Sequence, residues 1–337
     1  RTMEAGSGLV DAALAAKGLD RSFAGEDWVN GVVIQARTLR ILTETLEGIE
    51  RTGRVPIEAD QISVRPDGQI AIRVTPLDAW DRVLFPGWRA EVRLDPAVSI
   101  NDLDDHLGSF YTKGGVAEPG VAAVMGAGNV ACIPAVDVIH KLFVEGKATV
   151  VKFNPVNDYI GPFFEWVFAD LIEEGYVRAA YGAADEGAHL TRHPLVTEVH
   201  LTGSLATHDA IVYGRGEEGA ARKARGERLL AKRITSELGN VSPVIVVPGR
   251  WGAREMRFQA EHLATQMKQN DGFLCNAAKV LVLHEAWEQK EEFLDALREV
   301  LSRLPARRAY YPGAIERWES FTASHPDVEL IGPVGSG

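Results

Sequence analysis

The sequence predicts an α/β protein, with a doubly wound parallel-sheet domain followed by the start of a second α/β domain. From Gly120 onward, short apolar runs alternate with helical patterns, which is typical of βαβ units. The run at 243–247 is apolar throughout, as expected for a buried parallel strand. A further helix, strand and helix follow that run. We therefore expect one domain over residues 1–240 and a second, incomplete domain over 241–337.

Three regions precede this alternation. Residues 1–55 read as helical, because apolar residues recur there at helical spacing. Residues 61–74 predict a β-hairpin, since two alternating segments flank Asp67 and Gly68 at the turn. Residues 77–118 have weak periodicity, so we expect short elements and irregular connections.

The elements after Gly120 are predicted in turn. Strands are expected at 121–125, 148–153, 177–181, 196–201, 234–239, 243–247 and 278–283. Helices are expected at 134–144, 159–174, 186–192, 205–213, 251–268 and 286–304. The segment 328–331 looks like another strand. Because the chain begins with Arg1 and stops just after that segment, both ends look cut, and we expect it to be part of a longer protein.

Composition restricts the classes of function. A chain of 337 residues is long enough for two domains, and its net charge of 36 − 47 = −11 argues against general affinity for nucleic acid or an anionic membrane. We see no apolar run that would cross a membrane and no signal peptide. With only two cysteines, a disulfide framework is implausible and a cytoplasmic location is expected. No cluster of cysteine and histidine has zinc spacing, so no metal site is expected.

The segment 270–276 links a predicted amphipathic helix to a predicted strand and carries Cys275. A short link of this kind is an unusual place for a core thiol, and Gly272 allows a close approach of the backbone or a positive φ. A cysteine nucleophile needs its thiolate form and donors for the oxyanion that develops on a carbonyl. Taken alone, such a cysteine is more often structural than catalytic, so its candidacy depends on other residues. We interpret Cys132 as core packing.

Two residues could complete a nucleophilic site. Asn129 follows a glycine-rich turn at the end of a strand, where α/β sheets bind ligands, so its amide could donate to an oxyanion. The alternative is a turn asparagine bonded to its own backbone. Glu237 lies between Ile234 and Leu238, and partial burial there would make its carboxylate a stronger general base. The alternative is a paired structural carboxylate.

Two further positions suit a ligand with phosphates or hydroxyls. Lys152 lies inside an apolar strand, so its amine either extends to solvent or binds an anionic or hydroxylated group. Ser204 opens a predicted helix, where it either helps to bind a phosphate or merely caps the helix. The segment 214–233 is dense in Arg, Glu and Gly, and we favour a surface insertion over an anion site there. The turn 126–128 lacks the third glycine of the usual dinucleotide-binding fingerprint.

Taken in order, these sites resemble the aldehyde dehydrogenase superfamily over about residues 120–285. The matching segments are Gly128-Asn129-Val130, Val151-Lys152-Phe153-Asn154-Pro155, Leu201-Thr202-Gly203-Ser204, Glu237-Leu238-Gly239-Asn240-Val241-Ser242-Pro243 and Asn270-Asp271-Gly272-Phe273-Leu274-Cys275. The resemblance implies a Rossmann-like cofactor domain over 1–240 and a catalytic domain over 241–337. It also implies oxidation of a small aldehyde to a carboxylic acid with NAD or NADP.

The resemblance implies roles for the individual residues. Cys275 would attack the aldehyde carbon, and the Asn129 side chain with the Cys275 backbone N–H would hold the oxyanion. Glu237 would activate the water that hydrolyses the thioester. The implied cofactor-binding residues are Lys152 at the adenosine ribose or its phosphate, Ser204 at the pyrophosphate, Gly203 and Gly239.

Departures from the family pattern leave alternatives open. The family often has a glutamate that favours NAD three residues after the lysine, but this chain has Pro155, which leaves NADP open. Asn240 replaces a usual glycine. A relative that acylates coenzyme A, or an acyl-CoA reductase, has support only from the basic residues near 222–225, and a non-catalytic member is the third alternative. The same resemblance predicts a homo-oligomer, a dimer or tetramer, formed through the hairpin at 61–74.

Overall fold

The computed structural model describes residues 1–112 and 119–332, which form two compact units. The first unit comprises Arg1–Ala36, Gly120–Leu142 and Lys147–Gly337, and the second comprises Arg37–Pro119 and Phe143–Gly146. Every predicted catalytic or cofactor-binding residue belongs to the first unit. The domain boundary at 240/241 stays a prediction.

The first unit is built around a five-stranded sheet in the order β6-β5-β4-β7-β8. Its strands are β4 (Val121–Met125), β5 (Ala148–Lys152), β6 (Val177–Ala180), β7 (Val196–Thr202) and β8 (Arg233–Glu237). All neighbouring strands run parallel. The chain adds β5 and β6 on one side of β4 and then β7 and β8 on the other, which is the doubly wound arrangement. This part of the fold prediction is confirmed.

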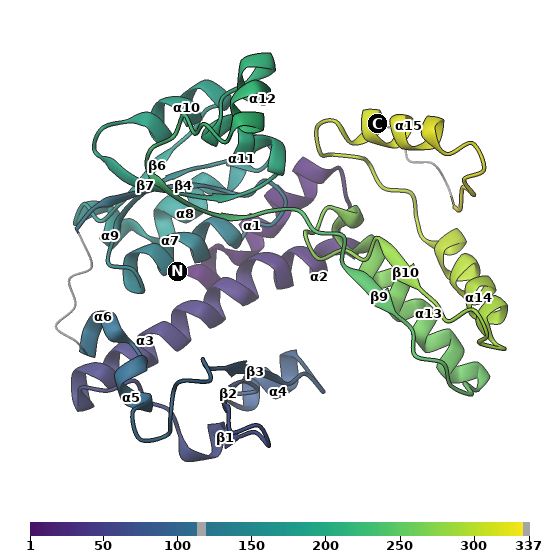
Figure 1. The fold of residues 1–337 in the computed structure, drawn as a ribbon, viewed down its shortest axis with the longest axis horizontal. Helices are drawn as coiled ribbons and strands as arrows, with labels where there is room; N and C mark the ends of the chain where they lie inside the picture. Colours follow the sequence, from purple (N-terminus) through teal and green to yellow (C-terminus); the bar gives the residue numbers. More distant parts are fainter. Residues whose placement is uncertain (113–118, 333–337) are drawn as a thin grey trace. The chain divides into compact units, whose positions relative to one another are not determined.

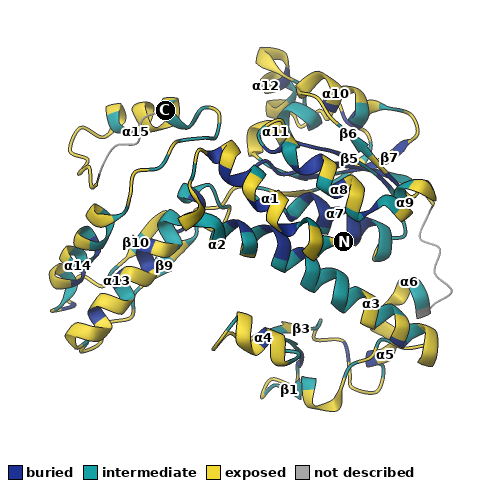
Figure 2. Ribbon diagram, turned by 180° about the vertical axis from the view of Figure 1, so that it is seen from behind, coloured by how far each residue is buried: buried dark blue, intermediate teal, exposed yellow. Residues whose placement is uncertain are grey.

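Helices cover both faces of this sheet (Figure 1). They are α7 (Ile133–Phe143), α8 (Gly161–Val167), α9 (Ala169–Glu173), α10 (Ala184–Arg192), α11 (Leu205–Val212) and α12 (Gly216–Arg225). The helix predicted over 159–174 is divided at Phe168, whose backbone (φ −98°, ψ 19°) lies outside the helical region. Helix α12 lies in the predicted surface insertion, and most of its residues are exposed (Figure 2).

The predicted N-terminal helices are confirmed. The helices are α1 (Thr2–Lys17), α2 (Ala24–Asp27), a π-helical turn at Trp28–Val33 and α3 (Ile34–Thr52). Lys17 at the end of α1 forms a buried ion pair with Asp27 at 2.5 Å. Each charge offsets the desolvation cost of burying the other. The pair holds the end of α1 against the start of the π-helical turn. No described helix has both the length and the apolar content to cross a bilayer.

A second α/β segment follows the sheet within the first unit. Its elements are β9 (Pro243–Ile245), α13 (Ala253–Lys268), β10 (Val280–Val282), α14 (Lys290–Arg303) and α15 (Ala314–Ser324). Strands β9 and β10 pair in parallel, and α13 packs on α14 around Met256, Leu263 and Phe293. The helix pair buries the inner face of this small sheet, so the start of a second α/β layer is present as predicted.

Two expectations for this segment are wrong. The run 243–247 is not buried, because Ile245 is 70% and Val247 76% exposed. Val244 and Val246 alternate with these two residues and pack on the α13–α14 core, so the opposite face of the β9–β10 pair is uncovered in the described chain. The segment 328–331 is not a strand, since no strand of the described chain pairs with it.

The second unit contains the predicted hairpin. Its elements are β1 (Ile62–Val64), β2 (Ile70–Thr75), α4 (Ala79–Leu84), β3 (Ala90–Arg93), α5 (Leu103–His106) and α6 (Ser109–Thr112). Strands β1 and β2 are antiparallel, with Ile62 opposite Ile72, so the hairpin is confirmed. Strand β3 adds to β2 and was not predicted, because it is short and half of its residues are charged. The core of the unit contains Ile70, Ile72, Val98 and Leu103.

An ion pair in the second unit gives a prediction about pH. The Asp81 side chain is 1% exposed and receives Arg37 Nε at 2.7 Å and Nη2 at 2.8 Å. The hydrogen bond from Arg37 holds the pKa of Asp81 below its usual value. The stabilisation is therefore present above the unfolded pKa of about 3.9 and is lost as the pH falls through the folded value.

We expect Asp81→Asn to lower the free energy of unfolding by about 3 kcal/mol at pH 7, because it leaves Arg37 partly buried without its counter-charge. Urea titrations from pH 7 to pH 3 should show the difference from wild type shrinking below about pH 4. The control is Asp104→Asn, which removes an exposed pair with Arg54 and should change stability by less than about 1 kcal/mol. A difference for Asp81→Asn that grows toward acid would contradict the assignment.

Candidate active site and cofactor cavity

Four sequence-predicted sites meet at one edge of the five-stranded sheet. Lys152 is the last residue of β5, and Glu237 is the last residue of β8. Gly203 and Ser204 directly follow β7, and Asn129 follows β4 after the glycine-rich turn. Since these strands are parallel, their carboxyl ends lie together, and open α/β sheets bind their ligands at that edge.

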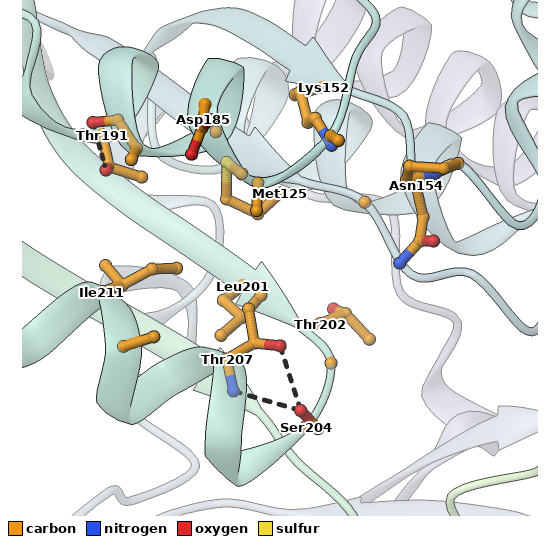
Figure 3. A pocket seen from close by; sticks show the side chains of 18 of the residues that line it. Met125, Lys152, Asn154, Asp185, Thr191, Leu201, Thr202, Ser204, Thr207 and Ile211 are labelled. Atoms are coloured by element: carbon orange, nitrogen blue, oxygen red, sulfur yellow. Dashed lines mark hydrogen bonds between the residues drawn. The ribbon is translucent and has the colours of Figure 1, made fainter. Parts of the chain in front are cut away.

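A cavity of about 600 Å³ opens at this edge, lined by residues of α10 and α11 and by the ends of the central strands (Figure 3). Lys152, Gly203 and Ser204 line it, so the structure brings these three predicted residues together. Its apolar wall includes Met125, Leu201 and Ile211, and its charged rim includes Asp185, Arg192 and Arg215. The combination of an apolar wall and a few polar groups is typical of small-molecule sites.

Lys152 is the most buried charged group in the wall of this cavity. It is 6% exposed, and its amine makes no hydrogen bond or ion pair within the described residues. Burial lowers the pKa of Lys152, while the carboxylates of Glu186 and Asp158 oppose that shift. The amine has no protein partner among the described residues and lies in the lining of the cavity, so a ligand oxygen that reaches it would gain a charge-assisted hydrogen bond.

Ser204 acts as the N-cap of α11. Its Oγ accepts a hydrogen bond from the Thr207 backbone N–H at 3.1 Å and lies 3.0 Å from Thr207 Oγ1 (Figure 3). The capping interpretation is therefore confirmed, and a role in binding phosphate remains a prediction. The Gly203 backbone N–H donates to the Glu237 carbonyl at 3.0 Å, which fixes the end of β8 beside this turn.

Asn129 contacts the segment that carries Cys275. Its Nδ2 donates to the Phe273 carbonyl at 2.7 Å, and its own carbonyl accepts from Asn270 Nδ2 at 2.9 Å. The side chain thus bonds the cysteine segment and not its own turn. Cys275 is exposed, and its backbone N–H donates no hydrogen bond in the described part of the chain. Tyr311 packs on Phe273, with ring centroids 5.5 Å apart, and also lines the cavity.

Three other residues singled out from the sequence do not line the cavity. Glu237 is exposed, so its expected partial burial is wrong, because in the described chain β8 is an edge strand that pairs with β7 alone. Among residues 1–112 and 119–332, no hydrogen bond or ion pair joins Glu237 to Cys275. Gly239 is exposed and does not line the cavity. Cys132 is 5% exposed and burial raises its pKa to about 12, so core packing is confirmed.

Sequence reasoning gave no role to Asn270 or Tyr311. Asn270 is 2% exposed and has a left-handed backbone (φ 49°), which Asp271 (φ 53°) and Gly272 (φ 77°) share. A sequence of Asn, Asp and Gly is the signal that could have indicated this conformation, since these residues tolerate it best. Tyr311 belongs to no motif.

The described residues contain no group of three or more His, Cys, Asp or Glu side chains placed to hold a metal ion.

Comparison with known proteins gives matches to one protein family. The profile described as "Aldehyde dehydrogenase family" matches residues 116–314. A curated relative, 4-trimethylaminobutyraldehyde dehydrogenase A of Danio rerio, is 26% identical over 298 residues, which cover 84% of this chain and 53% of the relative. The chain therefore spans about half the length of that relative.

Solved structures share the fold. The substrate-bound state of Staphylococcus aureus AldH superposes with a TM-score of 0.60 at 14% identity, covering 99% of this chain and 60% of the other. The NADP complex of NADP-dependent glyceraldehyde-3-phosphate dehydrogenase from Bacillus halodurans C-125 gives 0.55 at 16% identity, covering 91% and 50%. The profile match extends over more than half of the 337 residues, and the chain therefore belongs to the aldehyde dehydrogenase family.

Proposed function

We propose that this chain supplies the cofactor site and the nucleophile of an oxidoreductase that converts a small aldehyde to a carboxylic acid with NAD or NADP. The observation that carries the proposal is the hydrogen bond from Asn129 to the segment that bears the exposed Cys275. Tyr311 joins that segment to the cavity lined by Lys152. Membership of the aldehyde dehydrogenase family supports aldehyde oxidation in general.

The cavity suits a nicotinamide dinucleotide, which would accept a hydride from the aldehyde carbon. The unpartnered amine of Lys152 would donate to ribose hydroxyls or to a phosphate. Ser204 opens α11, where the helix N-terminus favours anions such as a pyrophosphate. Arg192 and Arg215 at the rim add positive charge, and Pro155 in the wall supplies no carboxylate that would repel a ribose phosphate. We therefore propose NADP as well as NAD.

The proposed chemistry uses Cys275, Asn129 and Glu237. The Cys275 sulfur attacks the aldehyde carbon, a C–S bond forms and the carbonyl oxygen takes the negative charge. The Asn129 amide has two N–H groups, of which Phe273 engages one and the other can donate to that oxyanion together with the Cys275 N–H. Loss of the hydride leaves a thioester on the sulfur. Glu237 would then take a proton from the attacking water, and the thiolate leaves.

The test is to incubate the full-length protein with a panel of aldehydes and either NAD or NADP, following the absorbance of the reduced cofactor. Turnover without coenzyme A supports hydrolysis of the thioester. No turnover across the panel, with cofactor binding intact, would contradict the proposal. Turnover that requires coenzyme A would instead favour the acylating alternative, although each basic residue proposed to support it is already paired with a carboxylate, as in Arg222–Glu218, Lys223–Asp209 and Arg225–Glu227.

The proposal also includes assembly and location. We propose a cytoplasmic homo-oligomer formed through the β1–β2 hairpin, on the basis of the family resemblance and of two free cysteines. Light scattering that finds only monomer would remove the assembly.

Replacing Lys152 by methionine tests the cofactor site. Methionine keeps most of the apolar stem and removes the donor, so we expect cofactor binding to weaken by about 10- to 100-fold, the value of a hydrogen bond to a charged group. Fluorescence titration with NAD and NADP would measure the loss, and the KM for the aldehyde should change little. The control is Lys279→Met, because Lys279 is exposed and lies outside the cavity. Equal affinity for Lys152→Met and wild type would remove Lys152 from the site.

A further inference from the structure

Three hydrogen bonds form a closed cycle between the Asn129 turn and the segment before Cys275. Asn270 Nδ2 donates to the Asn129 carbonyl at 2.9 Å, and Asn129 Nδ2 donates to the Phe273 carbonyl at 2.7 Å. The Phe273 backbone N–H donates to the Asn270 carbonyl at 3.0 Å, which completes the cycle. Each link fixes the geometry of the next, so the two segments are held at two points and cannot pivot about a single bond.

Asn270 is held in place from the N-terminal helices and from the segment after α14. Its backbone N–H donates to Glu26 Oε2 at 3.2 Å, and Tyr310 Oη donates to its Oδ1 at 3.2 Å. Glu26 is itself fixed by Arg307 through hydrogen bonds of 2.7 and 2.9 Å. A left-handed backbone in a non-glycine residue is strained and persists only where its surroundings hold it. Asn270 therefore adopts one defined position.

From this cycle we infer that Asn270 is a positioning residue, which fixes the Asn129 amide relative to Cys275 for stabilisation of the oxyanion. The inference rests on the proposed function. Asn270 does not act on the substrate, because it is 2% exposed and its amide donates to a backbone carbonyl. It acts through Asn129. An oxyanion donor works only when it is held in place before the charge develops, and a displacement of about 1 Å can cost 10²-fold in rate.

Two substitutions remove the amide donor and keep the backbone conformation. Asn270→Gly removes the side chain where φ is positive, and Asn270→Asp keeps the shape and the acceptor for Tyr310. For both, we expect kcat to fall by about 20- to 100-fold with KM for aldehyde and cofactor nearly unchanged. In a background of Asn129→Ala, which itself should lose about 10²- to 10³-fold, each should cost less than about 3-fold more, because the donor that Asn270 positions is gone.

A purely structural role would give a different pattern. The control Tyr310→Phe removes a contact to Asn270 but leaves its amide donor, so it should lower thermal stability while keeping kcat within about 3-fold of wild type. Losses of kcat that are equal in the wild-type and Asn129→Ala backgrounds would overturn the inference. So would unchanged kcat in folded Asn270→Gly and Asn270→Asp.

A second measurement does not depend on turnover. Hydrogen exchange of the peptide 127–133 should become at least about five-fold faster in Asn270→Gly than in wild type or Tyr310→Phe, because the anchor of that turn is lost. If the wild-type protein oxidises no aldehyde, the proposed function fails, and this comparison still decides whether Asn270 holds the Asn129 turn. Unchanged exchange would overturn the inference in that case too.

Discussion

Replacing Cys275 by alanine is expected to lower kcat by at least about 10⁴-fold, because the C–S bond through which the reaction would pass cannot form. Binding of NAD or NADP should stay within about two-fold of wild type, since Cys275 does not line the cavity of Lys152 and Ser204. Steady-state absorbance assays would measure the first effect, and fluorescence titration the second. Activity of Cys275→Ala within ten-fold of wild type would exclude a covalent mechanism at this residue.

The chain offers a matched control because it has one other cysteine. Cys132 is buried and its pKa is raised to about 12, so it is neither accessible nor ionised near neutral pH. Cys132→Ala should keep kcat close to wild type and reduce thermal stability. Iodoacetamide should label wild type at one site, label Cys132→Ala equally and leave Cys275→Ala unlabelled. Labelling of Cys275 no faster than a free cysteine would favour a non-catalytic family member.

The sheet was predictable because its strands carry a local signal. Parallel strands covered on both faces read as near-continuous apolar runs, and β4 and β5 come closest to that pattern. Strands β7 and β8 carry polar residues between their apolar ones, and for them the signal is the β-branched residues placed between two helical patterns. The order of those strands is not local information. Glu237 is exposed because it ends an edge strand, and Ile245 is exposed because it lies on the face of β9 opposite Val244 and Val246, which pack on the α13–α14 core.

The same distinction applies to the site. Asn129 and Cys275 could be predicted as site residues from the turns that carry them and from the resemblance to a family. In the structure, the Asn129 side chain donates a hydrogen bond to the segment before Cys275. The role of Asn270 could not be predicted, because its contacts come from Glu26 and Tyr310, which are 244 and 40 residues away along the chain. A buried amide with partners so distant is recognised only when the chain is folded.

Replacing Glu237 by glutamine is expected to separate the two halves of the reaction. The proposed thiolate attack and hydride loss do not need this carboxylate, so one equivalent of reduced cofactor should still form rapidly. Hydrolysis of the thioester should then slow by about 10³-fold, within the usual contribution of a general base. Rapid-mixing absorbance would show a burst followed by a slow steady state, and intact mass spectrometry should find the acyl group on Cys275.

The structure makes this substitution conservative. Glu237 is exposed, and its backbone pairs with Thr202 in the sheet and accepts a hydrogen bond from the Gly203 N–H, both of which glutamine retains. Fold and cofactor cavity should therefore be unchanged, so a slow second step can be assigned to the missing carboxylate. Glu288→Gln, at another exposed position, should behave as wild type. If coenzyme A restores fast turnover to Glu237→Gln and also accelerates wild type, the natural acceptor is a thiol and not water. If the burst and the steady-state rate are both unchanged, Glu237 is not the general base but an exposed carboxylate at the end of an edge strand.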